Sequence, residues 1–114
     1  MLSAKFRLRQ DKDFTRVFRG GRRASAGLVL ITFSPNRLRE PRYAVVVGTK
    51  VSKRAVVRNR LKRRIREQLR LLIKDKVVRG GFDAIVSVRP GADKLRAAIL
   101  EAQVEAALIR ARLL

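Results

Sequence analysis

The sequence lacks cysteine, histidine and tryptophan, and only nine of its 114 residues are acidic. Without cysteine the chain has no disulfide framework and no thiolate metal site, which suits the cytoplasmic location that we expect. Without histidine, acid–base or metal-assisted catalysis would depend on carboxylates. Asp11, Asp13 and Asp93 stand where helices are predicted to begin, and no two of the nine acids form a pair suited to such chemistry. The sequence therefore predicts a binding protein and identifies no metal ligand.

Long apolar runs are also missing from the chain. No stretch approaches the roughly 20 apolar residues that a membrane span needs. Met1–Gln10 is basic and is not followed by the apolar core of a signal peptide. The length suits one domain. We therefore expect a single domain across residues 1–114, with residues 1–10 as a mobile basic lead-in and no membrane partner.

Positive charge, by contrast, is abundant. The chain has 29 Lys and Arg residues and a formal net charge of +20, yet 46% of its residues are hydrophobic. That hydrophobic share is enough to bury a core, so the charge does not imply disorder. A net charge of this size predicts a polyanionic partner. Nucleic acid is the commonest such partner, and an anionic membrane surface is the rival.

The charge is densest between residues 50 and 70, where ten Lys or Arg residues stand against the single acid Glu67. Apolar residues recur there at helical spacing, which predicts one buried stripe of a helix from about Arg54 to Lys74: Val57, Leu61, Ile65, Leu69 and Leu72. The basic side chains fall on the opposite side. A core-anchored helix would thus hold a rigid row of guanidinium groups toward an acidic partner, with Glu67 in an intrahelical ion pair.

The other elements are expected around this helix. Asp11 should cap a short helix, Lys12–Arg19, and Asp93 should cap a last helix, Lys94–Leu114. The last helix should bury a stripe made of Leu95, Ile99, Ala102, Ala106, Ile109 and Leu113. Strands are predicted at Arg22–Ser25, Leu28–Ser34, Tyr43–Thr49 and Phe82–Arg89. We expect Tyr43–Thr49 to be a central strand in an antiparallel hairpin with Leu28–Ser34. The order αβββαβα predicts a small two-layer α+β sandwich.

Phe14, Val17 and Phe18 share one face of the first helix. The two rings are either ordinary core residues or a stacking platform for unpaired bases, and spacing alone does not decide between these readings. In the first long strand, alternation places Val29, Ile31 and Phe33 on one face.

The segment Lys53–Glu67, read as Lys-Arg-Ala-Val-Val-Arg-Asn-Arg-Leu-Lys-Arg-Arg-Ile-Arg-Glu, resembles the bacterial ribonuclease P protein subunit. That family carries an Arg-Asn-Arg motif in this setting, followed by Ile/Leu-Lys-Arg and then Arg-Glu or Arg-Gln. The resemblance extends to Asp13–Gly20, to Arg42–Ser52 and to Asp83–Pro90. The long form of the motif, in a chain of this length and charge, makes the resemblance specific.

The resemblance implies a function and a set of partners. In the family, a catalytic RNA subunit with bound Mg²⁺ removes the 5′ leader of precursor tRNA. The protein helps that RNA to fold, and it holds the leader between its first helix and its sheet. It would need no protein partner and would bind no cofactor by itself. The family also implies an unusual left-handed β-α-β crossover.

Carried over residue by residue, the resemblance implies two sets of site residues. The RNA-binding set is Lys53, Arg54, Arg58, Asn59, Arg60, Lys62, Arg63 and Arg66. The leader-binding cleft would be lined by Phe14, Phe18, Val29, Ile31 and Phe33. Ile31 stands where relatives often have tyrosine, so it cannot stack as an aromatic or donate a hydrogen bond. Asn59 could bond a base, a 2′-hydroxyl or a hydrated metal.

Two other functions fit parts of the pattern. A structural RNA-binding protein, such as a ribosomal protein, would have the same charge without a substrate role. An architectural DNA binder is less favoured, because the sequence contains no groove-reading module.

Overall fold

The computed structural model describes residues 2–114 of the chain. Its elements, in chain order, are the 3-10 turn η1 (Ala4–Phe6), helix α1 (Asp11–Gly20), strands β1 (Arg22–Ala26), β2 (Val29–Pro35) and β3 (Arg42–Val46), helix α2 (Ala55–Lys74), strand β4 (Phe82–Val88), the 3-10 turn η2 (Ala92–Lys94) and helix α3 (Ala97–Arg110). The predicted α+β class and the order αβββαβα are confirmed.

The four strands form one mixed sheet in the order β1-β2-β4-β3. β1 pairs antiparallel with β2, β2 pairs antiparallel with β4, and β3 lies parallel to β4. The expected β2–β3 hairpin and the central place of β3 are therefore wrong. α2 carries the chain back across the sheet after β3, so β4 inserts between β2 and β3 as their shared neighbour. Strands β3 and β4 with α2 form the crossover unit that the resemblance implies.

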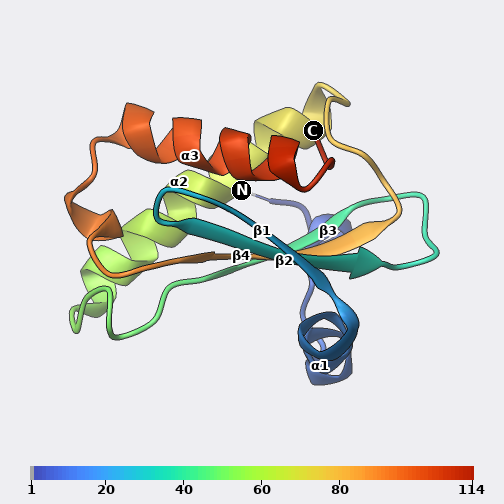
Figure 1. The fold of residues 1–114 in the computed structure, drawn as a ribbon, viewed down its shortest axis with the longest axis horizontal. Coiled ribbons are helices and arrows are strands. Elements are labelled where there is room, and N and C mark those ends of the chain that lie inside the picture. The colour runs from blue at the N-terminus through green and yellow to red at the C-terminus, as the bar shows by residue number, and fades with distance from the viewer. Residues whose placement is uncertain (1) are drawn as a thin grey trace.

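Helices cover both faces of this sheet (Figure 1). α2 and α3 lie over one face, where the main core contains Leu61, Ile65, Leu100 and Leu108. The short helix α1 lies against the other face, where Val17 packs with Leu8 and Ile85 in a smaller cluster. The sheet with α2 and α3 makes the two predicted layers, and α1 adds a partial cover on the far side.

The N-terminal segment is attached to the fold, whereas a mobile lead-in was expected for residues 1–10. Leu2 and Leu8 are buried, and the backbone N–H of Leu8 donates to the carbonyl oxygen of Tyr43 at 2.9 Å. Arg7 and Tyr43 form an isolated parallel bridge. These contacts place residues 2–8 along the outer edge of β3, because two leucines in this basic segment find apolar surface there.

The two acidic helix caps are placed differently from the prediction. Asp11 is the first residue of α1, and Gln10 occupies the N-cap position. Asp93 lies in η2, and α3 begins only after Arg96. Neither N-cap residue makes a side-chain capping hydrogen bond.

The predicted buried stripe of the last helix is confirmed only in part. Leu113 is 1% exposed, and Leu95 and Ala106 pack against the core, but the other predicted positions are exposed. The helix buries Leu100, Val104, Ala107 and Leu108, whereas Ile99 is 46% exposed and Ile109 is 53% exposed. α3 is apolar around most of its circumference, so periodicity alone does not select the face that meets the sheet.

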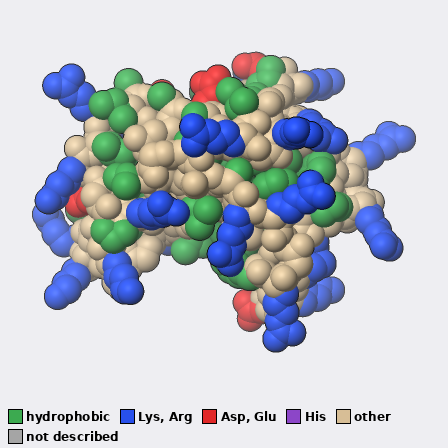
Figure 2. All heavy atoms as spheres, in the orientation of Figure 1, with side chains coloured by type: hydrophobic (Ala, Val, Ile, Leu, Met, Phe, Trp, Pro, Cys, Tyr) green, Lys and Arg blue, Asp and Glu red, His purple; other side chains and the backbone are tan. Residues whose placement is uncertain are grey.

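Figure 2 shows Lys and Arg side chains protruding over the whole visible face, with acidic side chains at only a few places. Apolar patches lie between them. The described residues contain no helix that is both long and apolar enough to cross a membrane.

Candidate nucleic-acid interface

Helix α2 holds its cationic side chains outward because its other side is anchored in the core. Leu61, Ile65 and Leu69 are each at most 3% exposed, as the predicted stripe requires, and Val57 and Leu72 are half-buried. The predicted RNA-binding residues all keep exposed surface. Lys53, Arg54, Asn59, Arg60 and Arg63 are exposed, and Arg58, Lys62 and Arg66 are half-buried. One rigid helix therefore carries most of them.

Arg58 forms hydrogen bonds within the protein that its place in the motif did not indicate. Its guanidinium donates to the carbonyl oxygens of Ser52 at 3.0 Å and Lys53 at 2.9 Å. These bonds tie the turn before α2 to the first turn of the helix. Part of the Arg58 donor capacity is thus used within the protein, while Arg60 and Arg63 form no ion pair with another residue in the range 2–114.

A groove of about 560 Å³ runs between α2 and the N-terminal segment. It is lined by Asn59, Arg63, Arg66 and Glu67 from α2 and by Arg7 from the other side. The Arg7 Nε donates to the carbonyl oxygen of Leu2 at 2.8 Å, which fixes this side chain in place. Sequence reasoning missed Arg7. The sequence did contain a sign of this arrangement, because Leu2 and Leu8 are apolar residues in a basic segment. Their burial holds Arg7 beside the helix.

Glu67 is the one acid on this stretch of α2, and its predicted ion pair is present. The Arg70 Nη2 lies 2.6 Å from the Glu67 Oε1, and the Arg70 Nε also donates to this carboxylate. The hydrogen bond from Arg70 lowers the pKa of the Glu67 carboxyl. Glu67 therefore stays ionised and offsets one charge at the end of a strongly basic groove.

The predicted leader cleft is divided between the two faces of the sheet. Val29 and Ile31 are fully buried and Phe33 is 8% exposed, and all three belong to the core under α2 and α3. Val29 and Ile31 cannot line a cleft beside α1, so their predicted placement is wrong. Phe33 keeps a small exposed surface, but it lines a different hollow beyond the C-terminal end of α1. Alternation did group the three correctly, but it does not tell which face of a strand α1 covers.

The α1 side of the sheet presents different side chains. Phe14 is half-buried against the Val17 cluster, whereas Phe18 is 51% exposed, and their ring centroids lie 6.5 Å apart. The strand register aligns Leu30 with Ser87 and Ser87 with Val46, one row along from the residues that α1 covers. Val46 is 40% exposed. An exposed ring and a partly apolar sheet surface thus lie on the same face.

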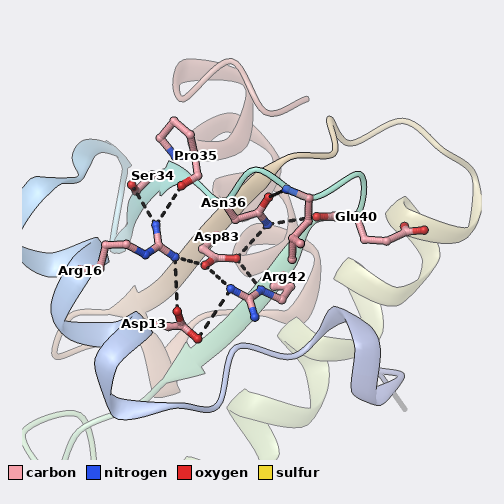
Figure 3. Close-up of polar contacts among 9 residues, drawn as sticks. Asp13, Arg16, Ser34, Pro35, Asn36, Glu40, Arg42 and Asp83 are labelled. Atoms are coloured by element: carbon pink, nitrogen blue, oxygen red, sulfur yellow. Dashed lines mark hydrogen bonds and ion pairs between the residues drawn. The ribbon is translucent and has the colours of Figure 1, made fainter.

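A buried carboxylate fixes α1 to the sheet (Figure 3). Asp83, at the start of β4, has no exposed surface. It accepts hydrogen bonds from the Arg42 Nε at 2.8 Å, the Arg42 Nη2 at 2.7 Å and the Asn36 Nδ2 at 2.9 Å, and it is paired with Arg16 of α1. Arg16 also donates to the carbonyl oxygen of Pro35 at 2.9 Å. We call Asp13, Arg16, Asn36, Arg42 and Asp83 the Asp83 network.

The electrostatics of the Asp83 network follow from these contacts. Burial by itself would raise the pKa of the Asp83 carboxyl, but the hydrogen bonds from Arg42 and Asn36 and the charges of Arg42 and Arg16 lower it. The hydrogen bond to Asp83 raises the pKa of Arg42 in turn. Asp13, expected only as a helix-start acid, lies 3.7 Å from both Arg16 and Arg42. The network is therefore a charged clamp.

The carboxylates do not form a metal site among residues 2–114, because no three of them gather in one place. Both carboxylate oxygens of Asp83 already contact Arg16, Arg42 or Asn36.

Comparisons with known proteins agree with one another. The family model described as Ribonuclease P matches residues 2–112. The chain is 43% identical over 91 residues to the ribonuclease P protein component of Synechococcus elongatus, covering 76% of this chain and 73% of that protein. It is 36% identical over 107 residues to that of Roseiflexus castenholzii, covering 93% and 85%.

Solved structures are similar as well. The RNase P protein of Thermotoga maritima, determined with 1-(4-fluorophenyl)-2-thiourea, has a TM-score of 0.81 at 29% identity and covers 91% of this chain and 98% of its own. A Staphylococcus aureus RNase P protein mutant with defective mRNA degradation activity has a TM-score of 0.88 at 23% identity, covering 96% and 91%. The second likeness concerns the fold alone.

Proposed function

The chain belongs to the ribonuclease P protein family, and from this membership we propose that it binds the catalytic RNA subunit of ribonuclease P and the 5′ leader of precursor tRNA. In this proposal it promotes Mg²⁺-dependent endonucleolytic removal of the leader, which is tRNA 5′ maturation. The chemistry belongs to the RNA subunit and its metal ions. The protein acts in the cytoplasm and needs no protein partner.

The observation that carries the proposal is the outward cationic row of α2. Asn59, Arg60 and Arg63 stand on a helix whose opposite side is locked by Leu61 and Ile65. Guanidinium groups held on a rigid scaffold suit phosphate contacts, since arginine presents a planar fork of donors. The groove that Arg7, Arg63 and Arg66 line gives an RNA backbone a track to follow. Asn59 supplies a neutral donor and acceptor in the same groove.

The opposite face of the sheet supports a role for leader binding. An unpaired nucleotide needs a flat surface for its base, and the exposed ring of Phe18 offers one. The row Leu30, Ser87 and Val46 would extend that surface under neighbouring bases. The Asp83 network holds α1, and therefore Phe18, at a fixed place relative to the sheet. The protein would thus use α2 for one RNA and the α1 face for the other.

The test is cleavage of precursor tRNA by a cognate ribonuclease P RNA at low Mg²⁺, with and without the protein. We expect the protein to stimulate 5′ cleavage. RNA binding without stimulation would contradict the proposal and would favour a structural RNA-binding role.

A further inference from the structure

A second arginine cluster lies at the end of the sheet opposite the first turn of α2. Arg22, Arg79 and Arg112 line one hollow of about 420 Å³ together with Phe33 and Phe82. They come from the start of β1, the turn before β4 and the turn after α3. The volume lies within the range of small-ligand sites in proteins. We refer to this feature as the Arg22 hollow.

The parts of the Arg22 hollow are held in position. The Arg79 guanidinium lies 5.2 Å from the centre of the Phe82 ring, and its Nη1 donates to the carbonyl oxygen of Arg112 at 3.2 Å. The Phe82 and Phe33 rings meet edge to face at 6.3 Å. Arg22 pairs with Phe33 across strands β1 and β2. The hollow therefore has an aromatic wall with a guanidinium stacked on it.

The charge of the hollow is not compensated within the fold. No carboxylate lines it, and in the described part of the chain none of its three arginines forms an ion pair. Arg16 and Arg42 show the contrast, since both are paired with Asp83. Three cations around one space repel one another until an anion enters it. Guanidinium forks beside an aromatic ring suit a phosphate joined to a flat base.

The place of the hollow separates it from the surfaces already described. Phe82 begins β4, whereas α2 follows the far end of β3, and these two strands are parallel. The start of β4, which lines the hollow, and the first turn of α2 therefore lie at opposite ends of the sheet, and Figure 1 shows this arrangement of the two elements. The hollow also lies beyond the end of α1, because Gly20 lines it.

We propose that the Arg22 hollow is an additional RNA site that binds one unpaired nucleotide, its phosphate between Arg22 and Arg112 and its base against the Arg79–Phe82 stack. The proposal rests on the proposed RNA-binding function and extends it, because RNA would then be held at both ends of the sheet. An RNA chain is favoured over an acidic peptide because the wall of the hollow is formed by aromatic rings, which can pack against a base.

The first test uses the intact protein and fluorescent oligouridylate, whose affinity is measured against salt concentration. Arg22→Ala with Arg112→Ala is compared with Arg39→Ala and Lys74→Ala, which removes two exposed charges that line other surfaces. We expect the first pair alone to lower the log–log slope by about 0.7, the value for one phosphate on a single strand. Equal slopes for both pairs would overturn the proposal.

The second test keeps every arginine in place. Gly20 lines the hollow, and a Cβ added there meets no atom within 4 Å, so a side chain can be attached at this position without a clash at the Cβ. Gly20→Glu would offer the arginines an internal carboxylate, and Gly20→Gln is its neutral control. Oligouridylate carrying 4-thiouridine should crosslink to the peptide that contains Phe82, and Gly20→Glu alone should abolish that crosslink. Crosslinks confined to α1 and α2 peptides would refute the site.

Competition distinguishes the possible occupants. Uridine monophosphate should suppress the Phe82 crosslink better than inorganic phosphate or polyglutamate does. Equal suppression by inorganic phosphate would reassign the hollow to a free anion, and equal suppression by polyglutamate would reassign it to an acidic peptide. These experiments measure binding and crosslinking and not cleavage. A protein that lacks the proposed site can therefore be distinguished from one that does not stimulate 5′ cleavage of precursor tRNA.

Discussion

Arg42 and Arg60 carry the same guanidinium group in two opposite settings. Arg42 meets the buried Asp83 through two hydrogen bonds, and Arg16 joins them from α1. Arg60 stands exposed on α2 and has no ion-pair partner among residues 2–114. The first arginine is part of what holds the fold together, and the second is left available to a partner. The comparison teaches that the number of charges alone does not identify a binding surface. An arginine that has no carboxylate partner within the fold is the one left available to an anionic partner.

The largest effect should come from Arg42→Ala, which breaks the paired side of this comparison. The change leaves the buried Asp83 carboxylate with fewer donors, and losing one partner of a buried ion pair typically costs about 3–5 kcal/mol. Urea unfolding measures the loss. Arg60→Ala is the matched control and should change the free energy of unfolding by less than about 0.5 kcal/mol. Equal losses would mean that the two arginines do not differ as described.

The unpaired side is tested by Arg60→Ala combined with Arg63→Ala. RNA binding should weaken and depend less on salt, because each lost phosphate contact lowers the log–log slope by about one. The free energy of unfolding should stay near that of the wild type. Lys74→Ala, in the last turn of the same helix, is the control for removing a charge. An unchanged slope in the double variant would place these residues off the RNA.

A smaller effect separates the two phenylalanines of α1. Phe18→Ala should reduce the affinity for leader-bearing tRNA by about 1–3 kcal/mol more than the affinity for mature tRNA, if the exposed ring stacks on a base. Phe14→Ala removes a half-buried ring and should lower the thermal midpoint as well. Binding to both tRNA forms should be compared for each variant. Equal losses with the two tRNA forms for Phe18→Ala would mean that this exposed ring does not contact the leader.

The smallest effect concerns pH. Because the pKa of Asp83 is lower in the folded protein, its contribution to stability is complete above the unfolded value of about 3.9. The contribution is lost as the pH falls through the folded pKa, since the unfolded chain takes up the proton first. Urea midpoints measured from neutral to strongly acidic pH should therefore fall less steeply below pH ~4 in Asp83→Asn than in the wild type. Parallel curves would argue against the clamp.

The parts of the fold that sequence determines locally were predicted well. The buried stripe of α2 can be recognised in the sequence because Leu61, Ile65 and Leu69 each stand between polar or charged neighbours. The same reasoning misassigned Ile99 and Ile109 of α3, which resemble the residues that are buried but are exposed. The choice between a hairpin and a crossover for β3 depends on β4, which lies about 40 residues further along the chain.

The candidate site divides in the same way. The cationic residues of α2 follow from the motif and the helical period, and the structure leaves Arg60 and Arg63 exposed and Arg58, Lys62 and Arg66 half-buried. The Asp83 network joins four segments across the chain, so spacing could not assemble it. One signal was present, because an aspartate inside the apolar run Phe82–Val88 needs a buried partner. The β2 residues of the predicted leader cleft were placed on the wrong side of the sheet, because only tertiary packing decides which side of β2 meets α1.

The position of β4 has a consequence for how the protein is made. β4 is the last strand in the chain, yet it lies between β2 and β3, so each of these lacks a neighbour until residue 88 has been synthesised. An N-terminal portion that has left the ribosome without β4 would expose open strand edges and the apolar side of α2. Folding is then expected to wait for nearly the whole chain, and during that interval the basic helix has abundant ribosomal RNA beside it before its own sheet has closed.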